Sequence, residues 1–332
     1  MTIIELETLG YYEPGFLHLR VNTDFDLSDL NTIIKNDKKL FSTFLHEYIH
    51  FLQDVTTTTG LTYSIFYISL IKDINWNIIN DGKSEFEVPY VFNNNFNILT
   101  QFQLRQVYQG DNIIENYAKY ERYEKEIVEI IDKDNNILKP TKYKVFYYDN
   151  NRTYKNFHIG IICLKEYVAH KIQSAFYDET NHPDIPYQII ELIIDKECSY
   201  FGKNTKNIIA LCDACLMCYH PVEMFFNTLE QIKKVNFIPE NVDEVYDFTY
   251  KDLKFHRDGK YYDINSLYDE TLDTSTKEFQ NALQSEIFQT NFNWVRQILE
   301  SGKKLRNEKR TFMTELLNDD NNLSDTFFSI FH

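Results

Sequence analysis

Apolar residues occupy nearly every face of a helical repeat between Lys38 and about Thr57. The apolar members of this stretch are Leu40, Phe41, Phe44, Leu45, Ile49, Phe51, Leu52 and Val55. A helix that is apolar on all sides is a buried one, so we expect this segment to lie inside the protein. After the break at TTTTG, residues 61 to 79 predict a second helix that packs back on the first.

The segments on either side of this helix pair have different patterns. Residues 1 to 23 alternate loosely and predict one or two short strands, whereas residues 26 to 36 resemble a short capped helix. A polar and aromatic helix is expected around residues 97 to 122. Beyond it, alternating apolar runs flank the turn-forming clusters DKDNN and DNN, which is typical of a β-hairpin or small meander.

Helical patterns resume at residue 159 and continue to the end of the chain. Helices are predicted over 159–178, 186–201 and 204–220, and the next one begins at Pro221, a residue suited to a first helical turn. From about residue 238 the pattern is amphipathic, charged and helical. The fold class that follows is α+β with mainly α-helices. We expect residues 1–79 and 158–235 to form the two parts of a helical core, with residues 80–157 as an insertion that contains the β-hairpin. Residues 236–332 are expected to form a C-terminal helical region.

Composition and charge narrow the function classes. The chain of 332 residues is 43% hydrophobic and 16% aromatic, which favours a folded protein, and it has only 9 Gly and 7 Pro, which favours helices. Its 34 basic and 50 acidic residues give a formal charge of −16, which disfavours nucleic acid and anionic membranes as partners. A protein, a peptide or a small molecule is therefore the expected partner.

The N-terminus and the cysteines indicate a cytoplasmic protein. The opening residues MTIIELETLGYYEPGF carry acidic residues where a signal peptide would carry basic ones, and no apolar run approaches the roughly 18 to 20 residues of a membrane-spanning helix. Five cysteines, four of them between Cys198 and Cys218, do not resemble a secreted disulfide framework. We expect reduced thiols.

The apolar helix contains the motif His46-Glu47-Tyr48-Ile49-His50. Residues four apart share one helix face, with Cβ atoms about 6 Å apart, so both imidazoles can reach one metal ion. Glu47 lies one residue round from His46, where its carboxylate can act as a general base on a water molecule. Two histidines and a glutamate are costly in a buried helix unless they are paired or bound to metal, although hydrogen-bonded core histidines are the plain alternative.

A catalytic zinc ion needs a third protein ligand. The compact metzincin pattern, with a third histidine six residues after the second, is excluded because that position is Thr56. The best candidate from another helix is Glu166 in CLKEYVAHKIQ, where the small Ala169 allows a close approach to the HExxH helix. His170, Glu191 and His220 remain alternatives.

With Glu166 included, the sequence resembles the gluzincin branch of the zincin metallopeptidases, in which a glutamate on a later helix completes HExxH. The resemblance implies a zincin-like helical core in which His46, His50 and Glu166 bind Zn²⁺ and Glu47 is the general base. The stretch FLHEYIHFLQDVTTTTGL is also similar to a motif of uncharacterised bacterial proteins. Both likenesses cover only two short segments of the chain.

The sequence departs from that family at two points. Glu166 follows the motif at a longer separation than in compact gluzincins, which requires residues 80–157 to be an insertion. His170 replaces the aspartate of the family's ExxxD pattern, and it is expected to orient a ligand, to stabilise the oxyanion of a tetrahedral intermediate, or to be the third ligand itself.

Three further features have a chemical and a plain interpretation. Asp54, one turn after His50, is either an acceptor that holds an imidazole N–H or a solvent-facing residue. Tyr48 faces the site or belongs to the core. Cys212, Cys215 and Cys218 form CxxCxxC on a predicted helix, where three cysteines are more typical of small core residues than of a metal site.

The function predicted from these patterns is a zinc-dependent metallopeptidase that acts on a specific intracellular protein or peptide. Glu47 would activate the water, and the negative net charge disfavours nucleic acid and membrane, so neither is expected as a partner. The alternative is a non-catalytic, acidic helical interaction protein that uses the same scaffold.

Overall fold

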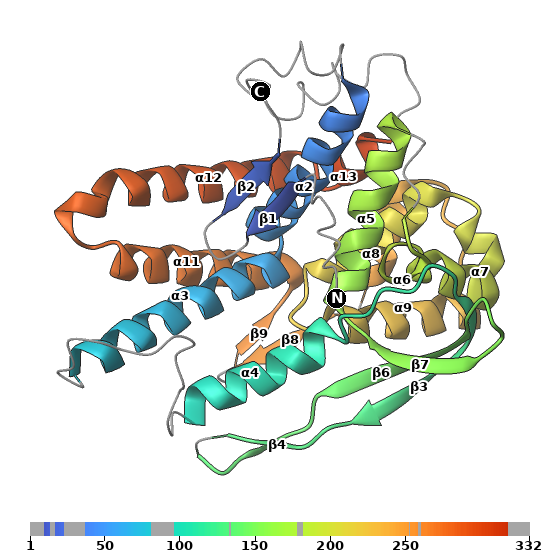
Figure 1. Ribbon diagram of the computed structural model, residues 1–332, viewed down its shortest axis with the longest axis horizontal. Coiled ribbons are helices and arrows are strands. Elements are labelled where there is room, and N and C mark those ends of the chain that lie inside the picture. Colours follow the sequence, from blue (N-terminus) through green and yellow to red (C-terminus); the bar gives the residue numbers. More distant parts are fainter. Residues whose placement is uncertain are drawn as a thin grey trace, which may run out of the picture.

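The computed structural model describes residues 10–13, 17–22, 37–80, 96–132, 134–177, 182–251, 253–257 and 260–317. Over these residues the protein is mainly α-helical, with small antiparallel sheets, which confirms the predicted class (Figure 1). The short helix expected over residues 26–36 lies outside the described residues.

Helix α2 (Lys38–Thr56) carries the HExxH motif through the middle of the molecule. It begins where the Asp37 carboxylate accepts a hydrogen bond from the Leu40 N–H at 2.9 Å, a typical N-cap. The predicted burial is confirmed for Phe41, Leu45, Ile49, Leu52 and Val55, which are at most 3% exposed, whereas Leu40, Phe44 and Phe51 are only partly buried. Helix α3 (Thr58–Asn80) follows at once, and a Cβ atom at Gly60 would lie 2.2 Å from the Cα atom of Asp54, so this reversal of the chain requires glycine.

Helix α5 (Ile161–Phe176) lies alongside α2 (Figure 1). Ala169 is completely buried in α5, as are Leu164 and Val168. The predicted close packing of a second apolar helix on the HExxH helix is therefore present.

The described strands form small antiparallel sheets, one of which packs on α2. Strands β1 (Gly10–Glu13) and β2 (His18–Val21) pair antiparallel and contact α2, which confirms the short strands predicted before residue 23. Strands β3 (Lys119–Ile127), β6 (Thr141–Tyr148) and β7 (Tyr154–Ile159) form an antiparallel sheet in that order. A two-stranded extension, β4 (Ile130–Ile131) with β5 (Ile137–Leu138), lies between β3 and β6, so the predicted hairpin or meander is confirmed.

The helix predicted around residues 97–122 is wrong beyond residue 109. Helix α4 (Phe96–Gln109) ends before Gly110, which has a φ of +76° that only glycine adopts readily. The residues from Lys119 onward pair with β6 instead. Tertiary pairing overrides the local pattern here.

The remaining helices surround this centre. They are α6 (Asp184–Tyr187), α7 (Ile189–Gly202), α8 (Thr205–Leu216), α9 (Pro221–Val235), α10 (Val242–Tyr250), α11 (Ile264–Ala282), α12 (Gln289–Glu308) and α13 (Phe312–Glu315), with a 3₁₀ turn at Glu286–Phe288 and a hairpin of β8 (Phe255–Arg257) and β9 (Lys260–Tyr262). The main hydrophobic core draws on all four predicted segments, from α2 through β6, α5 and α8 to α13. The boundaries at residues 79, 157 and 235 stay predictions.

A buried ion pair anchors the C-terminal end of α2. Arg306 of α12 binds Asp213 of α8 through two hydrogen bonds of 2.5 and 3.1 Å. The same guanidinium donates to the carbonyl oxygen and to the hydroxyl of Thr56, each at 3.1 Å, and Tyr246 donates to Asp213 at 2.7 Å. A cation at this end of a helix satisfies terminal carbonyls and complements the helix dipole.

Replacing Arg306 by methionine should lower the free energy of unfolding by about 3–5 kcal/mol, because Asp213 would be left as an unpaired buried charge. Urea denaturation measures the loss. Lys304→Met is the matched control on the same helix, since Lys304 is exposed and pairs with the likewise exposed Glu308, and its loss should change stability by less than about 0.5 kcal/mol. A loss of similar size in both variants would contradict this role for Arg306.

Candidate metal centre

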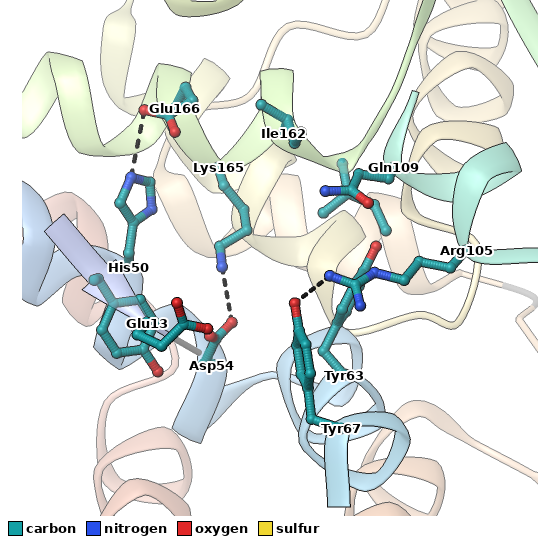
Figure 2. A pocket seen from close by; sticks show the side chains of 12 residues that line it. Glu13, His50, Asp54, Tyr63, Tyr67, Arg105, Gln109, Ile162, Lys165 and Glu166 are labelled. Atoms are coloured by element: carbon teal, nitrogen blue, oxygen red, sulfur yellow. Dashed lines mark hydrogen bonds and ion pairs between the residues drawn. The ribbon is translucent and has the colours of Figure 1, made fainter. Parts of the chain in front are cut away.

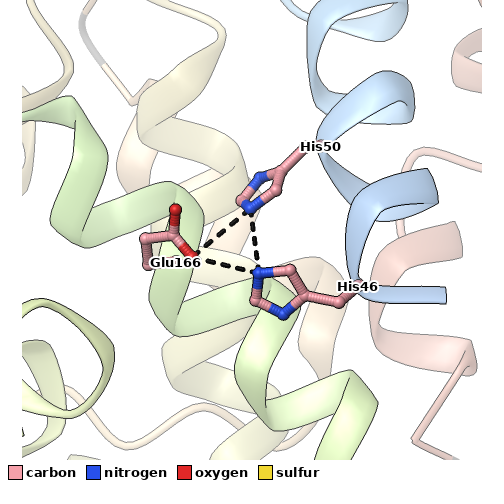
Figure 3. Close-up of side chains that lie close together, drawn as sticks. All are labelled: His46, His50 and Glu166. Carbon is pink, nitrogen blue, oxygen red and sulfur yellow. Dashed lines mark hydrogen bonds and ion pairs between the residues drawn. The ribbon is translucent and has the colours of Figure 1, made fainter. Parts of the chain in front are cut away.

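The structure brings His46, His50 and Glu166 together. The Glu166 Oε2 atom lies 3.1 Å from Nε2 of His46 and 3.3 Å from Nε2 of His50, and the two Nε2 atoms are 3.2 Å apart (Figure 3). Both histidines come from one face of α2, and the glutamate reaches them from α5. Glu166, the residue predicted as third ligand, therefore lies next to both histidines.

The other nitrogen of each imidazole faces a glutamine oxygen. Nδ1 of His46 is 3.1 Å from Oε1 of Gln173, and Nδ1 of His50 is 3.0 Å from Oε1 of Gln53. The Gln53 amide nitrogen donates to the carbonyl oxygen of Lys165 at 3.2 Å, which turns the Gln53 oxygen towards His50. An amide oxygen can only accept, so each Nδ1 carries the proton and each Nε2 presents a lone pair.

Three lone-pair acceptors consequently face one another at the centre of this group. Atoms held about 2.0–2.1 Å from a tetrahedral zinc ion lie roughly 3.3 Å apart, which agrees with the observed separations of 3.1, 3.2 and 3.3 Å. Two imidazole nitrogens and a carboxylate oxygen are a donor set suited to such an ion. The residues present therefore fit a metal ion of this kind.

A proton can take the place of the metal. Burial is the largest single effect on the pKa of Glu166 and raises it. The combined effect of the His50 and His46 imidazoles is larger and opposite, so the pKa lies well below its usual range. Burial likewise lowers the pKa of His50, while the Glu166 carboxylate raises it and prevails. The group attracts a positive charge whether this is a proton or a cation.

Glu47 interacts electrostatically with all three of these residues but does not belong to the ligand group. Burial raises the pKa of its carboxyl, the imidazoles of His46 and His50 lower it, and a hydrogen bond from the backbone N–H of Tyr12 lowers it slightly; the net shift is upward. Strand β1 thus holds the carboxylate against α2. A carboxylate with a raised pKa next to a metal site is suited to accept and return a proton.

The alternative third ligands lie elsewhere. Glu191 forms an ion pair with Lys171, and the His220 ring lies 4.5 Å from the Tyr108 ring. His170 is buried one turn beyond Glu166, with its Nδ1 3.3 Å from the Ser174 hydroxyl. None of the three belongs to the metal-binding group.

His170 is a neutral imidazole. Burial, followed by the neighbouring His182, lowers the pKa of His170 to about 3. Its ring centroid lies 4.7 Å from that of His182, which in turn lies 6.2 Å from that of His46. The His182 ring therefore links the His170 ring to that of His46. A catalytic role for His170 stays a prediction.

Both interpretations of Asp54 are wrong. The side chain is 3% exposed, so it does not face solvent, and its Oδ1 pairs with the Lys165 ammonium at 2.8 Å. The acceptor that holds the His50 imidazole is Gln53, which sits three residues after His50 and so reaches back along the same face. Tyr48 stacks between Phe44 and Phe51, which agrees with the interpretation of Tyr48 as a core residue.

Four residues of the site were missed from the sequence: Gln53, Gln173, His182 and Tyr187. Gln173 follows Glu166 by seven residues and so shares its helix face, a spacing that could have identified it. His182 donates to the Gln173 oxygen at 3.1 Å, and the Tyr187 ring lies 4.5 Å from the His182 ring. Burial, followed by the Glu166 and Glu47 carboxylates, raises the pKa of Tyr187, so its hydroxyl remains a donor.

The cysteines are free, buried core residues, as predicted. Burial raises the pKa of Cys218 to about 12 and raises the pKa values of Cys212 and Cys215 well above their usual range, so these thiols stay protonated in the apolar core. Within the described ranges, His46, His50 and Glu166 are the group of three whose ligand atoms converge.

No helix of the described residues combines the length and the apolar character needed to cross a bilayer. Comparisons of the chain with protein-family models, with curated proteins and with solved structures give no significant match. The function is therefore inferred from the chemistry of the side chains above.

Proposed function

We propose that this protein is a zinc-dependent metallopeptidase that hydrolyses a peptide bond in a protein or peptide. The observation that carries the proposal is the convergence of three lone pairs from His46, His50 and Glu166, with Glu47 beside them. Two histidines and one carboxylate are the protein ligands of many catalytic zinc sites, in which a fourth position stays open. The gluzincin resemblance of the two motifs supports the same assignment.

Zinc held by these ligands would polarise the scissile carbonyl and lower the pKa of a water molecule. Glu47 takes the proton from the attacking water and later passes it to the leaving amine. Gln53 and Gln173 fix the tautomers of the two histidines, so that both Nε2 lone pairs point at the metal position. Tyr187, whose hydroxyl stays protonated, is a neighbouring group that can donate to a developing oxyanion.

The purified protein should contain close to one zinc ion per chain, and His46→Ala should remove it. Mass-spectrometric metal analysis measures the content. His158→Ala is the matched control and should keep the zinc. His158 lies on β7, pairs with Asp111 and Glu126, and does not belong to the ligand group. Wild-type protein that stays free of metal in the presence of excess zinc would refute the proposal.

Replacing Gln53 by leucine should weaken zinc affinity by about 10- to 100-fold, because the His50 imidazole loses the acceptor that orients it. Competition with a chromophoric chelator measures the affinity. Gln280→Leu, at an exposed position of α11, should leave it unchanged. Equal affinities in all three proteins would show that Gln53 does not support the ligand.

Glu47→Gln should retain zinc and lose peptidase activity by about 10²- to 10⁴-fold, since an amide cannot accept the proton. Proteomes of cells that produce the wild type or the variant are compared for new protein termini. Fragments found only with the wild type identify the substrate as well as the activity. Identical proteomes, together with a zinc-loaded wild type that cleaves no peptide in vitro, would favour the non-catalytic interaction protein.

A further inference from the structure

A cavity of about 320 Å³ adjoins the metal centre. His50 and Glu166 lie on one side of it, and Arg105, Tyr63 and Tyr67 lie across from them (Figure 2). This volume is at the lower end of the range for ligand pockets, so the space suits one or two residues of a substrate. A group bound in it would lie next to the metal ligands.

Arg105 is held rigidly by aromatic rings. Its guanidinium carbon lies 5.2 Å from the ring centroid of Tyr63, 5.1 Å from that of Phe66 and 4.4 Å from that of Tyr67. One of its terminal nitrogens also donates to the Tyr67 hydroxyl. Cation–π contacts of this kind keep the side chain in one place and partly strip it of water.

Within the described residues, the guanidinium has no carboxylate partner. Its Nε atom is buried without a hydrogen-bond acceptor. The other cation of the cavity differs, because Lys165 is neutralised by Asp54 at 2.8 Å. A buried donor without an acceptor is costly, and arginine presents paired N–H groups that match a carboxylate.

The distance between Arg105 and the metal centre is fixed by two glycines. A Cβ atom at Gly160, the residue before α5, would lie 1.8 Å from the carbonyl oxygen of Gln109 at the end of α4. A Cβ atom added at Gly110 would likewise collide, because it would lie 2.5 Å from the Gly160 nitrogen. The helix that carries Arg105 is therefore in backbone contact with the helix that carries Glu166.

The charges of the cavity favour an anion once a divalent cation is bound. Its lining contains the carboxylates of Glu13, Asp54 and Glu166 and the cations Lys165 and Arg105, so zinc would leave one positive charge in excess. Glu13 is the carboxylate that would repel an anion, and Figure 2 draws it on the His50 side of the cavity, across from Arg105.

We propose that Arg105 binds a carboxylate of the substrate in this cavity, next to the bond that is cleaved. The inference rests on the proposed peptidase function and gives it a specificity. The carboxylate comes either from an acidic side chain beside the scissile bond or from the C-terminus of the substrate. Both sources present the same fork of two oxygens to the guanidinium.

The first test measures binding to the zinc-loaded protein and needs no catalysis. Succinic acid monohydroxamate carries a metal-binding group and a carboxylate, and its carboxamide analogue lacks only the charge. Calorimetry should show the acid binding at least about 10-fold more tightly than the amide to the wild type. Arg105→Gln should abolish this preference, and Arg105→Lys should retain part of it.

Acetohydroxamate separates the two proposals. It should bind the wild type and Arg105→Gln equally, which also shows that the variant is folded. If it binds neither protein, the metal centre and the proposed function fail. If it binds both but the acid and the amide bind the wild type equally, or if the preference persists in Arg105→Gln, the role of Arg105 is overturned while the metal centre stands.

The second test identifies the source of the carboxylate. A peptide library made from digested cell proteins is incubated with the wild type, and mass spectrometry locates the cleavage sites. Release of single C-terminal residues identifies the terminal carboxylate, and cleavage beside internal Asp or Glu identifies the side chain. Blocking the carboxyl groups by amidation should abolish cleavage; sites that ignore both features would overturn the proposal.

Discussion

The close approach of α2 and α5 is the constraint on which the rest of the structure depends. These helices pack through apolar side chains, with Ala169 fully buried in α5, yet they bring three polar ligand atoms to within 3.3 Å of one another. Buried acceptors without a shared proton or cation repel each other and have lost water. Binding of a cation by these ligands would therefore be coupled to folding of the helix pair, because the packing that buries the ligands brings their lone pairs together.

The C-terminal end of α2 is also fixed by specific contacts. Arg306 binds the last carbonyl of the helix, and Gly302, one turn earlier in α12, lies so close that its Cβ would be 2.6 Å from the Val55 oxygen. Helix α12 thus fixes the end of α2 by charge and by contact. The imidazoles lie between this anchor and the N-cap at Asp37, so neither end of their helix is left to move.

Much of this could be predicted from the sequence because the determining signals are local. The HExxH helix was recognisable from its apolar pattern, and Glu166 from an apolar helix with a small residue at the packing position. The signals that failed depend on contacts between distant segments. The helix after residue 97 ends at Gly110 because that residue meets Gly160, and Asp54 is occupied because Lys165 lies on the neighbouring helix. The spacing from Glu166 places Gln173 on the same helix face, but only the fold shows that its oxygen meets the His46 imidazole.

The carboxylates around the centre differ in what balances their charge, and this difference bears on the roles proposed for them. Asp54 is neutralised by Lys165, and Glu166 faces two imidazoles, so both have a fixed electrostatic partner. Glu47 has a backbone N–H and the more distant imidazoles, and its pKa is raised rather than lowered. When neighbouring carboxyl groups have pKa values shifted in opposite directions, the raised one is suited to proton transfer and the lowered one to holding positive charge. The environment therefore supports the proposed roles of Glu47 as base and Glu166 as ligand, although both are glutamates beside the same two histidines.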